Sequence, residues 1–75
     1  MAQSMQDWLA GFAAEFGIAP PTREEQDMLL KLAGIAAHAS ERTAAPITCW
    51  MAAWAGVEPR DALAIGRRLA GEKDG

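Results

Sequence analysis

The stretch TREEQDMLLKLAGIAAHAS, residues 22–40, decides the fold. Thr22 and Glu25 match the capping box, in which each side chain accepts a hydrogen bond from the other residue's backbone N–H at a helix start. Apolar residues then recur at helical spacing on one face: Met28, Leu29, Leu32, Ile35, Ala36 and Ala39. We therefore expect an amphipathic helix that runs to about Arg42. Its interior Gly34 predicts the close approach of another backbone.

The residues before this stretch predict a first helix. Ser4 is a suitable cap, and apolar residues share one stripe: Met5, Trp8, Leu9, Phe12 and Phe16. Gly17 tolerates the left-handed conformation that follows a helix end. The connector IAPPT, residues 18–22, should be extended because each proline biases its predecessor away from the α conformation. We expect Ile18 to fold back onto the first helix.

The residues after the stretch predict two more helices. Pro46 fits only the first turn of a helix, which we expect over 44–55 with Thr43 as its cap. This third helix is apolar nearly all round, which is typical of a helix that is central or shared with a partner. Gly56 ends it, and Pro59 begins a fourth helix. The fourth helix has one apolar face: Ala62, Ile65, Gly66 and Leu69.

No segment alternates apolar and polar residues as a half-buried strand would. The sequence therefore predicts an all-α fold, a compact bundle of four short helices that forms a single domain over 1–75. The ends, about 1–3 and 71–75, should fray. A chain of 75 residues with 51% apolar content buries only about 60 to 65% of its unfolded surface, so self-association would help, and a homodimer is one expectation.

Charge and cysteine usage exclude several classes of protein. A net charge of −3 argues against nucleic-acid binding, which needs clustered basic residues, and makes a helix-turn-helix reader the least favoured hypothesis. The single Cys49 cannot form an internal disulfide and, with one histidine, gives no metal-ligand spacing. We expect a cytoplasmic chain with no cofactor, no metal, no signal peptide and no membrane-spanning segment.

A polar cluster precedes the third helix. His38, Glu41 and Arg42 lie close in sequence to the expected N-terminus of this helix, where free N–H groups and Thr48 could help bind a phosphate or carboxylate. A structural interpretation competes with this one, because helix-end cations commonly bond the last carbonyls of their own helix. If the cluster is a site, a phosphorylated pterin or nucleotide is the ligand class we expect.

Catalysis has little support. Only Cys49 and His38 could act as nucleophile and base, and a cysteine in an apolar segment is usually a buried thiol with a raised pKa, so we expect no enzymatic activity. The tryptophans fall on helical stripes, which core packing would explain. A protein–protein interface is the supplementary interpretation, because Trp and Met are enriched in contact surfaces. The candidate interface residues are Trp50, Met51 and Trp54.

Three segments resemble a small uncharacterised bacterial helical family, found free-standing or attached to molybdenum cofactor guanylyltransferase. They are DWLAGFAAEFGI (7–18), LLKLAGIAAHASERTAAPIT (29–48) and MAAWAG (51–56), so the resemblance covers residues 7–56. Its most specific element is the pattern AH..ER.AAP.T, which begins at Ala37 and ends at Thr48. Cys49 and Trp54 depart from the family pattern, in which smaller or more polar residues are usual.

The resemblance implies an accessory role beside molybdenum cofactor assembly, with the guanylyltransferase as partner. The Gly-rich, Lys-containing loop expected of the guanylyltransferase itself is absent from the sequence. We therefore expect a non-catalytic interaction domain, with a small-ligand module at the His38 and Arg42 junction as the alternative. The association with the guanylyltransferase is a property of the family and not of an identified site.

Overall fold

In the computed structural model, which describes residues 3–71, four helices follow one another without a strand in that range. They are α1 (Met5–Glu15), α2 (Arg23–Ala39), α3 (Ala44–Trp54) and α4 (Pro59–Leu69). The prediction of an all-α bundle of four short helices is confirmed. The predicted frayed ends lie almost entirely outside the described residues.

Local capping explains where the first two helices begin. The Ser4 hydroxyl accepts a hydrogen bond from the Asp7 N–H at 3.0 Å. At the start of α2 the capping box is complete, because Glu25 N–H donates to Thr22 Oγ1 at 3.1 Å and Thr22 N–H donates to Glu25 Oε1 at 2.8 Å. Both bonds satisfy N–H groups that the helix itself leaves without a partner. These starts are the ones that the sequence predicts.

Two predicted details of the helix ends are wrong. Helix α2 ends at Ala39 and not near Arg42, because Ser40 leaves the helical conformation with φ −135° and ψ −104°. Thr43 stands before α3 in a helical conformation and makes no side-chain capping bond. The chain enters α3 through a backbone turn instead, in which the Ala44 N–H donates to the Glu41 carbonyl at 2.9 Å.

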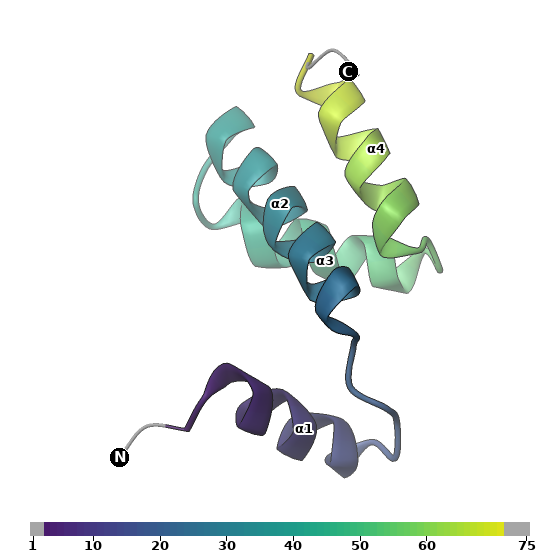
Figure 1. The fold of residues 1–75 in the computed structure, drawn as a ribbon. Helices are drawn as coiled ribbons and strands as arrows, with labels where there is room; N and C mark the ends of the chain where they lie inside the picture. Colours follow the sequence, from purple (N-terminus) through teal and green to yellow (C-terminus); the bar gives the residue numbers. More distant parts are fainter. Residues whose placement is uncertain (1–2, 72–75) are drawn as a thin grey trace.

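The core forms around α2, which contacts both α3 and α4 (Figure 1). Leu32 lies at its centre with 2% of its surface exposed, and Ala62 and Leu63 of α4 are buried against it. Partly buried side chains complete the core: Met28, Ile35, Cys49, Ala52 and Val57. Figure 1 shows α2 and α4 diverging toward the C-terminal end of each helix, with α3 crossing behind them.

Among the three helical glycines, Gly66 is the one packed closely against another helix, and Gly34 is not. A Cβ placed on Gly66 would lie 2.6 Å from Leu32 Cδ1, whereas one placed on Gly34 would meet nothing within 4 Å. The prediction that Gly34 marks a close approach is therefore wrong. Helix α4 needs glycine at 66 because it packs tightly on the buried Leu32 of α2.

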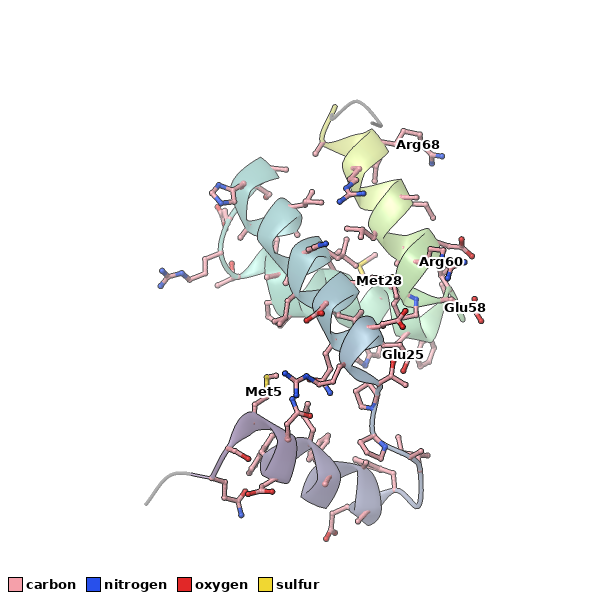
Figure 2. The ribbon with its side chains drawn as sticks, viewed as in Figure 1. Met5, Glu25, Met28, Glu58, Arg60 and Arg68 are labelled. Carbon is pink, nitrogen blue, oxygen red and sulfur yellow. The ribbon has the colours of Figure 1, made fainter. Side chains whose placement is uncertain are left out.

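Helix α1 stands apart from the other three (Figure 1) and is joined to α2 by a pair of side-chain amides. Gln6 Nε2 donates to Gln26 Oε1 at 2.8 Å, and Gln26 Nε2 donates both to Gln6 Oε1 and to the Pro21 carbonyl at 3.0 Å. Gln26 is 6% exposed. This amide pair fixes α1 beside the first turns of α2, with Met5 directed toward α2 in Figure 2.

The C-terminus of α1 has a glycine in the left-handed conformation. Gly17 has φ 67°, and the following Ile18 N–H donates to the Ala13 carbonyl at 3.1 Å. The predicted return of Ile18 onto α1 is therefore confirmed for its backbone, while its side chain stays exposed. This arrangement is the helix end that glycine permits most readily.

Candidate functional site

Helix α3 carries an apolar face that the other residues of the range 3–71 leave largely exposed. We call it the α3 stripe, and its residues are Ile47, Trp50, Met51 and Trp54. Helix α3 contains no charged residue, and the rings of Trp50 and Trp54 stack with centroids 5.1 Å apart. Trp50 is 61% exposed and Trp54 is 78% exposed. Large aromatic groups held in a fixed stack and left in water are typical of a contact surface.

Helix α1 carries a second uncovered face. We call it the α1 stripe, and its residues are Trp8, Phe12 and Phe16. Trp8 stacks on Phe12 with centroids 6.1 Å apart, and Phe12 meets Phe16 edge to face at 5.0 Å. All three side chains are more than half exposed. The interpretation of the tryptophans as core residues is therefore wrong for Trp8, as it is for Trp50 and Trp54.

An apolar groove lies between α2, α3 and α4, on the side where α2 and α4 diverge. It consists of two adjoining hollows that share Leu32, Thr48, Gly66 and Leu69. The remaining lining residues are Ile35, Ala36, Ala39, Ser40, Ala44, Met51, Ala52, Val57, Ala62, Ile65 and Ala70. Seven of these fifteen lining residues are alanine or glycine, so the groove has room for large side chains from elsewhere.

The structure does not gather the four residues of the predicted polar site, which are His38, Glu41, Arg42 and Thr48, into one bonded cluster. His38, Glu41 and Arg42 are exposed, and no hydrogen bond or ion pair joins their side chains within residues 3–71. Thr48 alone of the predicted set lines the apolar groove. The early end of α2 separates His38, which is helical, from Glu41 and Arg42, which lie in the connection to α3.

Cys49 is partly buried, and its thiol contacts α2. Its thiol donates a weak hydrogen bond to the Leu29 carbonyl, with Sγ and O 3.8 Å apart. Burial raises the pKa of the Cys49 thiol, because desolvation disfavours the thiolate. The group is thus held in its unreactive, protonated form at neutral pH, which agrees with the interpretation of Cys49 as a small core residue.

A charged crevice that sequence reasoning missed lies between the first turns of α2 and α4. Glu25 and Met28 of α2 face Glu58 and Arg60 at the start of α4 (Figure 2), and Thr22, Glu24 and Pro59 complete the lining. The crevice arises because α2 and α4 begin at the same end of the core. Glu25 also takes part in the α2 capping box, where its Oε1 accepts the hydrogen bond from the Thr22 N–H.

The described residues contain neither a metal centre nor a membrane span. Within residues 3–71, no three His, Cys, Asp or Glu side chains lie close enough together to hold a metal ion. None of the four helices combines the length and the apolar content that a bilayer crossing requires.

Comparison with known proteins gives one match. Residues 1–73 match the model of a family described as a domain of unknown function (DUF6457). No curated protein and no solved structure matches the chain. The family match spans all four helices, so the stripes and the groove all lie within the matched region.

Proposed function

The chain belongs to the DUF6457 family, domains of unknown function, and we propose that it is a non-catalytic interaction domain that binds a protein partner through the α3 stripe. The single observation that carries this proposal is the exposure of Trp50, Met51 and Trp54 on a helix without charge. Aromatic and methionine side chains dominate the energetics of protein contacts, and charged residues are depleted at the centre of such surfaces. The α3 stripe has both properties.

The other features of the chain favour binding over chemistry. The one thiol is held protonated by burial. The candidate ligand-binding residues His38, Glu41 and Arg42 lie in solvent without mutual contacts in the described part of the chain. A small-ligand module at this junction therefore has less support than a protein-binding surface on α3.

The partner that we propose is molybdenum cofactor guanylyltransferase. This choice rests on the resemblance of residues 7–56 to helical segments associated with that enzyme. The α3 stripe lies inside the resembling region, and Trp54 departs from the usual smaller residue there. A bulky indole at position 54 would enlarge the contact surface and adapt it to one particular partner.

The test is calorimetric titration of the purified chain with the guanylyltransferase, with and without GTP. Saturable heat is expected, and Trp54→Asp or Met51→Asp should weaken binding by about 30-fold or more. The matched control is Ala53→Asp, which places the same charge on the same helix outside the α3 stripe. Absence of heat would remove this enzyme as partner, and equal effects of Trp54→Asp and Ala53→Asp would remove the α3 stripe as the surface.

A further inference from the structure

The chain exposes more surface than a monomer of its size. Its accessible surface is 6098 Å² for a mass of 8.0 kDa, whereas a folded monomer of that mass exposes about 4,500 Å². Six terminal residues lie outside the range 3–71, and together they account for at most roughly 900 Å² of accessible surface. When this area is subtracted, the accessible surface still exceeds that of a folded monomer by about 700 Å². Each partner of a standard interface contributes about 800 Å², so one interface would remove the excess.

The position of α1 contributes to the excess. The radius of gyration is 13.3 Å, against about 11 Å for 75 residues packed around one core. Helix α1 stands apart from the other three (Figure 1), and all three side chains of the α1 stripe are more than half exposed. The α1 stripe is therefore one of two apolar faces, with the α3 stripe, that contribute to the excess surface.

The same chain contains a surface that complements the α1 stripe. The α1 stripe offers three large aromatic side chains at helical spacing, and seven of the fifteen residues that line the apolar groove are alanine or glycine. Large side chains inserted between small ones give the close packing that helix-in-groove contacts require. Helix α1 carries Asp7 and Glu15 with no basic residue, whereas α4 carries three arginines against Asp61, so the two elements attract each other as they approach.

The α1 stripe does not reach the groove of its own chain. The Gln6 and Gln26 amide pair holds α1 beside the first turns of α2, whereas the groove lies along the second half of that helix, from Leu32 to Ala39. At 1.5 Å per residue, Gln26 and Ile35 are about 14 Å apart along the axis. Closing that distance within one chain would require the buried Gln26 to lose its partner.

From these observations we infer that the apolar groove binds the α1 stripe of a second copy of this chain. In the resulting dimer the α1 stripe of each copy lies in the apolar groove of the other, and a two-fold axis makes the two contacts identical. Both amide pairs stay intact, and Trp50 and Trp54 stay free. The inference adds a dimer contact to the proposed function. The two surfaces share Met51, whereas Trp50 and Trp54 belong to the α3 stripe alone and Leu69 to the apolar groove alone, so Trp54→Asp and Leu69→Asp test the two contacts separately.

The first experiment is sedimentation equilibrium of the full chain over a concentration series up to roughly 1 mM. A mass that rises to twice the chain mass is expected. Phe12→Asp and Leu69→Asp should each weaken the dimer by about 30-fold or more. Ala14→Asp, on another face of α1, is the matched control and should leave the dimer unchanged. Circular dichroism of each variant confirms that the helices remain, since Phe12 and Leu69 are both exposed.

The second experiment identifies which surfaces meet. In a Cys49→Ala background, a Phe12→Cys protein is mixed with a Leu69→Cys protein and treated with a short bismaleimide linker. The two different chains should be joined preferentially. A Phe12→Cys protein that joins mainly to itself would show paired α1 helices and overturn the inference.

Two further outcomes would also overturn the inference. One is a monomer at every concentration. The other is a chain carrying both Phe12→Cys and Leu69→Cys that is linked only within itself, which would mean that α1 occupies its own groove. Loss of guanylyltransferase binding with an intact dimer would instead refute the proposed function alone.

Discussion

The side-chain amides of Gln6 and Gln26 form two reciprocal hydrogen bonds, at 2.8 and 3.0 Å, and these bonds decide where α1 lies. Gln26 is the only buried polar residue among those described, and its amide also holds the Pro21 carbonyl. A buried amide costs free energy unless it is bonded. The pair therefore favours one position of α1, beside the first turns of α2.

Replacing Gln26 with alanine should release α1 from α2. Three hydrogen bonds are lost, and we expect the free energy of unfolding to fall by about 1 to 3 kcal/mol. Hydrogen exchange should show faster amide exchange in α1 with little change in α2 to α4. Gln3→Ala, an exposed glutamine without a hydrogen bond among the described residues, is the control. Unchanged exchange in α1 would mean that other contacts hold it.

Alanine at the two helical glycines should have opposite effects. Gly66→Ala places a methyl group 2.6 Å from Leu32 Cδ1, and overpacking of a core typically costs about 1 to 3 kcal/mol, more than the helix propensity gained. Gly34→Ala meets no atom within 4 Å and should raise the free energy of unfolding by up to about 1 kcal/mol. Urea denaturation of both variants measures the difference. Equal effects would contradict the tight packing at Gly66.

The two threonines that precede helices should also differ. Thr22→Ala removes the hydroxyl of the capping box and should cost about 1 kcal/mol. Thr43→Ala removes a hydroxyl that makes no capping bond and should change the free energy of unfolding by less than about 0.5 kcal/mol. Thermal melts of the two variants test this. A loss at Thr43 as large as that at Thr22 would show a capping role that the geometry does not contain.

The stability of the chain should depend on the Cys49 thiol at alkaline pH. Because burial raises the pKa of this group in the folded state, the unfolded chain loses the proton first as pH increases. Stability is then fully present below the ordinary thiol pKa and decreases as pH rises through the higher pKa of the folded state. Denaturation at pH 7 and at about pH 10, compared with Cys49→Ala, measures this. An identical pH dependence in the variant would refute the assignment.

The sequence could predict those features of the fold that depend on neighbouring residues. The starts of α1 and α2 and the glycine after α1 depend on residues within a few positions of one another, and these predictions are confirmed. The bonding of Gln6 with Gln26 spans twenty residues and leaves no periodic signal. The position of α1 therefore could not be predicted, although its stripe could.

The candidate functional site could be predicted only in part, because it too depends on contacts between residues far apart in the sequence. An apolar stripe shows that a helix has a face to cover, but not whether the same chain covers it, so Trp8, Trp50 and Trp54 were interpreted mainly as core residues. The polar cluster depended on α2 reaching Arg42. Because α2 ends at Ala39, the side chains expected near one helix terminus lie in solvent. The prediction of an interface at Trp50, Met51 and Trp54 remains a prediction, and their exposure supports it.

Because the tryptophans lie on exposed faces, the intrinsic fluorescence of the chain should report on its binding to other molecules. No tryptophan lies in the core around Leu32, so intrinsic fluorescence changes little when an isolated monomer unfolds. Trp8 lies on α1, whereas Trp50 and Trp54 lie on α3. With Trp8 replaced by phenylalanine, the emission spectrum reads α3 alone, and with the α3 pair replaced it reads α1 alone. A blue shift of the emission in only one of the two variants shows whether α1 or α3 becomes buried on binding.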